Sequence, residues 1–274
     1  MAKIAVIGLG IIGGSICASL SKAGYKVDGT DLDGRAVAYA LRAGYIQNEA
    51  KEISSYDVVF IAIPPKATIS VLENTSFKDG ALVSDICGIK SGIEQAVYAK
   101  KRNYRYVGIH PMAGKETSGI AFASPDLFNN ANLVIALHEN TPHDALAQIK
   151  KYAKAMRFGR IVECSAEEHD RKIALTSQLA HIVSNAYVKS PQVQNCKGFT
   201  GGSFQDMTRI AGVDEKIWTE LYMHNREFVL EELDGLIEQL SVYRAALASE
   251  DTQALSDALK EGRVIRQNIK YKRT

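Results

Sequence analysis

Three glycines near the start of the chain, Gly8, Gly10 and Gly13, constrain the fold more than any other feature of the sequence. They follow the apolar run KIAVIG at 3–8 and open an apolar helical pattern. Between a strand and a helix, glycines at this spacing permit a tight turn, close approach of a pyrophosphate to the backbone, and close packing of the helix. The spacing alone is a weak signal, but its position here predicts a dinucleotide-binding turn.

An acidic residue, Asp31, stands at the end of the next expected strand, 25–31. A carboxylate there accepts hydrogen bonds from the adenosine ribose and repels a 2′-phosphate, so the sequence favours NAD over NADP. Arg35 leaves some use of NADP open, because its side chain could reach a 2′-phosphate; an exposed helix arginine is the other interpretation. Asp33 is expected to cap the next helix. The expected cofactor-binding residues are Gly8, Gly10, Ile11, Ile12, Gly13, Asp31, Ile63 and Pro64.

The first part of the chain alternates short β-branched runs with helical patterns, which is typical of a parallel sheet covered by helices on both faces. Strands are expected at 3–8, 25–31, 57–63, 81–85, 104–109, 132–137 and 158–164, and helices at 11–23, 34–43, 90–101 and 142–155. Beyond about residue 165, helical patterns dominate, at 167–188, 214–222, 225–247 and 251–270. We therefore expect a nucleotide-binding domain over 1–165 and an all-helical domain over 166–274.

The helical part contains segments with few polar residues, such as LTSQLAHIVSNAY at 175–187. A thin layer of helices cannot bury such segments by itself, so packing against a second copy is expected. The sequence therefore predicts a homodimer.

The composition is that of an ordinary globular protein, with 46% hydrophobic and 23% charged residues among 274. A net charge of +2 gives no argument for a nucleic-acid partner. No run of about 18 consecutive apolar residues is present that would span a membrane. The four cysteines are scattered without zinc spacing, so we expect reduced thiols, no metal and a cytoplasmic protein.

His110 is the first candidate for acid–base chemistry. Removing hydride from a carbinol carbon requires a partner for the hydroxyl proton, and histidine suits that task at neutral pH. His110 ends the expected strand 104–109, and Pro111 fixes the turn that follows. This position lies at the carboxyl edge of the expected sheet, along which doubly wound sheets form their ligand clefts. The loop that Pro64 and Pro65 are expected to begin lies at the same edge.

His181 is the second candidate. It recurs with Asp170, Ala174 and Ser177 along one stripe of an otherwise apolar helix. The stripe predicts that His181 faces the substrate, and a hydrogen-bonded core histidine is the other interpretation. His169 lies off the stripe near the helix start, where a capping or structural role is expected.

The segment GFTGGSFQDMTRIAG at 198–212 supplies candidates for substrate binding. The glycine pair ending at Gly202 lets backbone approach a ligand closely. Arg209 offers a planar fork suited to a carboxylate, and a salt bridge with Asp206 or another acid is the other interpretation. Trp218 is expected in the core or at an interface.

These segments together resemble the prephenate dehydrogenases and the related arogenate dehydrogenases of tyrosine biosynthesis. The resemblance covers almost the whole chain and rests on IGLGIIGGS, SDICGIKSG, GIHPMAGKETSG, EEHDRKIALTSQLAH, GGSFQDMTRIAG and IWTELYMHN. It implies an α/β fold, a Rossmann-type doubly wound parallel sheet followed by an all-α dimerisation domain. It also implies NAD-dependent oxidative decarboxylation of prephenate to 4-hydroxyphenylpyruvate.

The resemblance also implies roles for individual residues. His110 would bond the ring hydroxyl and assist its deprotonation, and Arg209 would bind the ring carboxylate. His181 matches the second histidine of the family, and Ser177 matches the serine of the same motif.

Two departures from the family pattern limit what the resemblance implies. Gly88 stands where many relatives have a serine that bonds the reacting hydroxyl, so a water or another group must substitute. Gln205 stands where some prephenate-selective members have a lysine, which makes arogenate an alternative substrate. More remote alternatives are another Rossmann-plus-helical hydroxy-acid or imine reductase and a non-catalytic NAD sensor.

Overall fold

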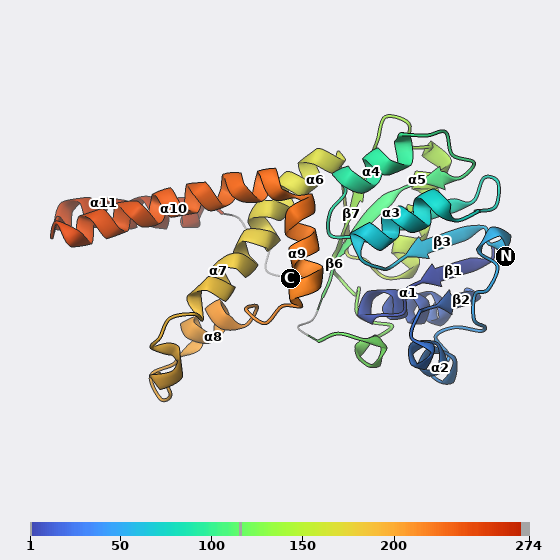
Figure 1. The fold of residues 1–274 in the computed structure, drawn as a ribbon, viewed down its shortest axis with the longest axis horizontal. Coiled ribbons are helices and arrows are strands. Elements are labelled where there is room, and N and C mark those ends of the chain that lie inside the picture. Colours follow the sequence, from blue (N-terminus) through green and yellow to red (C-terminus); the bar gives the residue numbers. More distant parts are fainter. Residues whose placement is uncertain (1, 115–116, 270–274) are drawn as a thin grey trace. The chain divides into compact units, whose positions relative to one another are not determined.

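The computed structural model describes residues 2–114 and 117–269 of the chain, and Figure 1 shows its elements in order. The chain divides after Asn225 into two compact units. The first unit holds both sheets and the helices as far as 224, and the second unit is a pair of long helices.

A five-stranded parallel sheet forms the centre of the first unit. Its strands, in spatial order, are β2 (Val27–Thr30), β1 (Ile4–Ile7), β3 (Val58–Ile61), β4 (Leu82–Asp85) and β5 (Arg105–Tyr106). All four pairings are parallel. Because the strands are parallel, their carboxyl ends lie along one edge of the sheet, where a doubly wound sheet binds its ligand. The order places β1 between β2 and β3 at this edge.

Helices cover both faces of this sheet, as the sequence pattern predicts. The surrounding helices are α1 (Ile11–Lys22), α2 (Gly34–Arg42), α3 (Pro65–Asn74), α4 (Ser91–Tyr98) and α5 (His143–Ala155). Val58 and Phe60 pack in a buried cluster with residues of α1, α2 and α5, whereas Val59 and Ile61 pack with residues of α3 and α4. Successive side chains of a strand point to opposite faces, so both faces are apolar.

The helix α3 corrects the expectation of a loop after Pro64 and Pro65. Proline lacks an N–H, but the first N–H groups of a helix have no partner within it, so Pro65 is well suited to the first turn. The expected cap of α2 is confirmed, because the carboxylate of Asp33 accepts a hydrogen bond from the backbone N–H of Arg35.

A second sheet corrects the expectation of one wholly parallel sheet. Its strands, in order, are β6 (Gly108–Met112), β7 (Asn132–Ala136) and β8 (Arg160–Cys164). β6 runs antiparallel to β7, with His110 opposite Val134, and β7 runs parallel to β8. His110 therefore lies inside a strand and does not end one. Pro111 is tolerated there because β6 is an edge strand.

The remainder of the first unit is helical, in agreement with the sequence pattern. After β8 come α6 (Ala166–Ile173), a π-helical segment (Ala174–Leu179), α7 (Ala180–Tyr187), a 3-10 turn (Val193–Asn195), α8 (Gly202–Thr208) and α9 (Glu215–His224). Two further 3-10 turns lie earlier in the chain, at Ile53–Ser55 and Ile120–Phe122. The second unit consists of α10 (Arg226–Ala248) and α11 (Thr252–Asn268), which pack along each other. Within the described residues, no helix is both long and apolar enough to cross a membrane.

Candidate active site

The glycine turn between β1 and α1 leaves the first turn of the helix open. Gly8 has a φ of +91°, and a Cβ there would lie 2.4 Å from the backbone oxygen of Ala62. A Cβ on Gly13 would lie 1.9 Å from the backbone oxygen of Gly8, so only glycine fits. A Cβ on Gly10 would meet nothing within 4 Å. The space beside Gly10 at the N-terminus of α1, a position suited to a phosphate, is therefore open.

Two cavities adjoin this turn. A cavity of about 290 Å³ is lined by several expected cofactor residues: Gly10, Ile11, Ile12, Gly13, Ile63 and Pro64. A second cavity, of about 470 Å³, is lined by Leu9, Gly10, Asp31 and Tyr39 among others. Gly10 lines both, so the two cavities meet at the turn where a pyrophosphate would lie.

Asp31 is held by backbone groups beside the second cavity. Its carboxylate accepts hydrogen bonds from the N–H groups of Leu9, at 2.6 Å, and Asp33, at 2.9 Å. The guanidinium of Arg35 forms an ion pair with Asp33, 2.9 Å from its carboxylate, and its side chain is 93% exposed. Its hydrogen bonds to Asp33 lower the pKa of that carboxyl. Arg35 also lines the cavity, so the residues present fit NAD and leave Arg35 close to the ribose site.

A third cavity, of about 510 Å³, brings together the histidine candidates. His110 from β6, Ser177 from the π-helical segment and His181 from α7 all line it. Nδ1 of His181 lies 2.9 Å from the backbone oxygen of Ser177. The ring of His181 packs against that of Trp218, with centroids 3.9 Å apart. Trp218 thus lines the cavity as well, a position that the expectation of a core or interface residue did not include.

The predicted stripe of the helix is only partly correct. Ala174 and Asp170 are buried and do not line the cavity that Ser177 and His181 share. The π-helical segment begins at Ala174, and its wider turn shifts the angular position of every residue after it. A regular spacing of 3.6 residues therefore fails across this point.

Three further sequence candidates lie on or just after α8. Gly202, Gln205 and Arg209 are exposed, and none of them lines the third cavity. The next residue along the chain, Ile210, does line it. Among the lining residues that the structure describes, there is no lysine or arginine, so this cavity of a single chain offers histidines as its only basic side chains.

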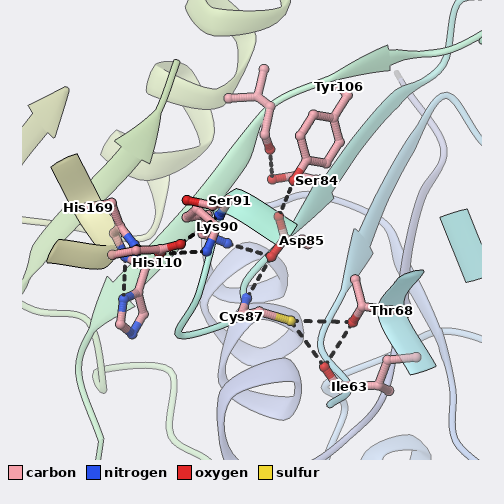
Figure 2. A network of polar contacts seen from close by, with 12 residues as sticks. Ile63, Thr68, Ser84, Asp85, Cys87, Lys90, Ser91, Tyr106, His110 and His169 are labelled. Atoms are coloured by element: carbon pink, nitrogen blue, oxygen red, sulfur yellow. Dashed lines mark hydrogen bonds and ion pairs between the residues drawn. The ribbon is translucent and has the colours of Figure 1, made fainter. Parts of the chain in front are cut away.

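His110 is the first member of a chain of hydrogen bonds (Figure 2). Its Nδ1 lies 2.9 Å from Nε2 of His169, and Nδ1 of His169 lies 2.7 Å from a carboxylate oxygen of Asp170. Asp170 also accepts the backbone N–H groups of Lys90 and Ser91, each at 2.8 Å. Sequence reasoning missed this role of His169, because its contact with His110 joins residues that are far apart in the chain.

Burial keeps His110 uncharged. Desolvation, followed by the charges of His169 and Lys90, holds the pKa of His110 well below the usual value for histidine. Desolvation also lowers the pKa of His169. At neutral pH, His110 is therefore a neutral imidazole that can accept a proton.

A buried ion pair supports the loop that faces His110. Nζ of Lys90 lies 2.5 Å from a carboxylate oxygen of Asp85, and the two side chains are 1% and 0% exposed. The hydroxyl of Tyr106 donates to the other oxygen of Asp85, and the N–H of Cys87 donates to the first. Figure 2 shows Asp85 between these donors. The network fixes both ends of the loop that carries Gly88.

Gly88 lies directly opposite the reactive edge of His110. A Cβ at Gly88 would lie 3.7 Å from Nε2 of His110 and 3.7 Å from Leu221 of α9. A serine at this position would bring its hydroxyl within reach of Nε2. The missing hydroxyl noted in the sequence therefore falls at the reacting edge of the histidine.

Comparisons with known proteins agree with this architecture. The model of the prephenate dehydrogenase nucleotide-binding domain matches residues 16–162, and that of the prephenate dehydrogenase dimerization domain matches 165–261. A prephenate dehydrogenase of Bacillus subtilis is 30% identical over 97% of this chain and 76% of its own length. A cyclohexadienyl dehydrogenase of Zymomonas mobilis is 28% identical, over 97% of this chain and 96% of its own.

A solved structure is similar over nearly the whole fold. Prephenate dehydrogenase from A. aeolicus, crystallised with hydroxyphenyl propionate and NAD+, has a TM-score of 0.85 and 26% identity, covering 98% of this chain and 99% of its own. The sequence motifs, the fold and the matches over residues 16–162 and 165–261 lead to the same conclusion. The chain belongs to the prephenate dehydrogenase family.

Proposed function

We propose that the chain catalyses the NAD-dependent oxidative decarboxylation of prephenate to 4-hydroxyphenylpyruvate, a step of tyrosine biosynthesis. The observation that carries the proposal is the position of His110, a neutral imidazole that lines a cavity of about 510 Å³. Ser118 lines both this cavity and the one beside the glycine turn, so substrate and nucleotide sites adjoin.

The cofactor would be held by the residues around the glycine turn. The backbone N–H groups of residues 11–13 would bind the pyrophosphate at the start of α1, where the space beside Gly10 is open. Asp31 would accept the hydroxyls of the adenosine ribose, and Ile63 and Pro64 would contact the nicotinamide half. When bound, NAD supplies the acceptor for the hydride.

His110 acts as the general base in this proposal. Its Nε2 would accept the proton of the ring hydroxyl while the carbon that bears it is oxidised. The oxidised ring then loses its carboxylate as carbon dioxide and becomes a phenol, and aromatisation makes the step effectively irreversible. The protein orients the two partners and accepts the proton.

Ser177, His181 and Arg209 would bind the substrate. Ser177 and His181 are supported by their place in the wall of the cavity. Arg209 is supported by the matching segment of the family and by Ile210, its neighbour in the chain, which lines the cavity. Gly202 and Gln205 precede Arg209 by about two turns of helix or less. They would contact the pyruvyl or alanyl side chain of the substrate.

Arogenate is the alternative substrate, favoured by one residue. Gln205 carries no charge, so it gives no preference for a pyruvyl side chain over an alanyl one. Selectivity at this end would come from a cation, and among the described lining residues of the cavity there is none besides the histidines.

We further propose a cytoplasmic homodimer with domains at 1–165 and 166–274. The matched dimerization domain and the apolar side chains exposed along α10 and α11, including Leu230, Ile237, Leu240, Leu259 and Ile265, support the dimer. The four cysteines are free thiols, which suits a reducing compartment.

The test is a side-by-side measurement of kcat/KM for prephenate and arogenate, each with NAD and with NADP. The proposal predicts formation of reduced nucleotide with NAD, faster with prephenate than with arogenate. A higher kcat/KM for arogenate would make arogenate the substrate in place of prephenate. The absence of turnover of either substrate by the folded dimer would refute the proposal.

A further inference from the structure

The hydrogen bonds behind His110 run in one direction only, and Asp170 sets that direction. Its carboxylate accepts two backbone N–H groups at the start of α4, where the helix dipole favours negative charge. Burial acts to raise its pKa, but hydrogen bonds from His169 and Ser91 bring the pKa of Asp170 below its usual value. Asp170 is therefore an ionised group that can only accept hydrogen bonds.

The protons on both histidines follow from this anchor. Nδ1 of His169 faces an acceptor and must carry a proton, so its Nε2, in the neutral ring, is an acceptor. Nδ1 of His110 faces that acceptor and must donate to it. In a neutral His110 this leaves Nε2 without a proton, on the edge that faces Gly88.

We propose that His169 is a positioning residue, which holds His110 in the tautomer with a proton on Nδ1 and so keeps Nε2 ready to accept the hydroxyl proton. The identity of the hydroxyl rests on the proposed function, whereas the tautomer of His110 does not. Asp170 anchors His169, and the start of α4 anchors Asp170. The first turn of α4 thus determines the reactivity of a side chain on β6.

The chain of hydrogen bonds from His110 through His169 to Asp170, here called the relay, controls the tautomer of His110, and the groups around the two histidines leave this role to it. The titratable groups that act on His110 are His169 and Lys90, and those that act on His169 include Asp170 and Asp85. Glu94 of α4 and Tyr106 of β5 interact in turn with Asp170 and Asp85. The cation of Lys90 is paired with Asp85, so the two charges offset each other. Among these groups, His169 is the one that hydrogen-bonds His110.

Two substitutions of His169 separate hydrogen bonding from packing. His169→Gln keeps an amide oxygen that can accept from Nδ1 of His110, whereas His169→Phe fills the same space without an acceptor. The control is His138→Phe, because His138, although only partly buried, also packs on a ring, that of Tyr98, with centroids 3.9 Å apart. His138 does not line any of the three cavities described above.

The direct test reads the tautomer from the ¹⁵N spectrum of histidine-labelled protein, with the His110 signals assigned by their loss in His110→Asn. We expect the unaltered chain and His138→Phe to show a protonated Nδ1 and an unprotonated Nε2 at His110. His169→Phe should add a population protonated at Nε2. A proton on Nε2 of His110 in the unaltered chain, or an unchanged tautomer in His169→Phe, would overturn the proposal.

Kinetics add a readout that a purely structural role would not move. We expect His169→Phe to lower kcat by about 10²-fold, the usual contribution of a well-placed base, with little change in KM. His169→Gln should recover most of this loss, because its amide oxygen can replace the acceptor that Nδ1 of His110 faces.

The outcomes separate the two proposals. If the tautomer is as expected but neither prephenate nor arogenate is turned over, the proposed function fails and the relay stands. If both substrates are turned over but His169→Gln is as slow as His169→Phe, the relay fails and the function stands. If His169→Phe does not fold, the spectrum of the unaltered chain and the rate of His169→Gln still decide.

Discussion

Gly10 and Gly13 lie in the same turn, yet alanine should affect them in opposite ways. A Cβ on Gly13 would lie 1.9 Å from the backbone oxygen of Gly8 and 2.9 Å from Cβ of Ala62. Neither neighbour is a flexible side chain, so α1 must shift away from β1, at a cost of about 3 kcal/mol, the upper part of the range for overpacking. At about 2–4 °C per kcal/mol, the Tm of Gly13→Ala should fall by roughly 6–12 °C.

Gly10→Ala should leave the fold intact and weaken the cofactor instead. Its φ is −69°, and an added Cβ meets nothing within 4 Å, so the Tm should stay unchanged or rise slightly through the loss of chain entropy in the unfolded state. The new methyl group would enter the two cavities that Gly10 lines, at the point of closest approach to the pyrophosphate. We expect the Kd for NADH to rise at least about tenfold, or about 1.4 kcal/mol.

Thermal unfolding and titration of NADH fluorescence measure the two effects separately. The reasoning predicts a stable Gly10→Ala that binds NADH weakly. It would be refuted if Gly10→Ala bound NADH as tightly as the unaltered chain, or if Gly13→Ala had an unchanged Tm.

Three further predictions concern single side chains. Asp31→Ala should shift the ratio of kcat/KM values from NAD toward NADP, and an unchanged ratio would contradict the ribose role of Asp31. Lys90→Met leaves Asp85 charged and buried, so urea unfolding should show a loss of about 3–5 kcal/mol in the free energy of unfolding; a loss below about 1 kcal/mol would contradict a paired buried charge. Because the pKa of His110 is lowered in the fold, kcat/KM should stay level as the pH falls to about 6.5 and decline only in more acidic solution. A decline in kcat/KM that begins above pH 7 would contradict the neutral imidazole. The same lowered pKa affects stability, because below about pH 6.5 the His110 side chain of the unfolded chain takes up a proton before that of the folded chain does. His110 should therefore lower the free energy of unfolding as the pH falls below about 6.5.

The doubly wound part of the fold was predictable because its strands are buried on both sides. β1 and β3 are continuous apolar runs bounded by turn residues, and such runs are typical of covered parallel sheets. The second sheet was not predictable in the same way. The run 104–109 contains the junction between β5 and β6, and the antiparallel partner of β6 lies more than twenty residues further along the chain. Periodicity reports which faces are buried, but it does not report which strand lies beside which.

The candidate site was also predictable only where local sequence motifs report on it. His110, Ser177 and His181 come from separate elements and meet in one cavity, as their motifs predicted. His169 was interpreted as structural, because a contact between β6 and α6 leaves no local pattern in the sequence. The π-helical segment likewise breaks the regular spacing on which the stripe through Asp170 relied. The roles of Gly202, Gln205 and Arg209 stay predictions.

The most direct test of the central claim compares His110→Asn with the unaltered chain in an assay that follows NADH and carbon dioxide together. The account predicts equal amounts of both products from prephenate for the unaltered chain. For His110→Asn it predicts a loss of kcat of about 10²–10⁴-fold with the Kd for NADH unchanged. Full activity of a folded His110→Asn at saturating substrate would contradict the account.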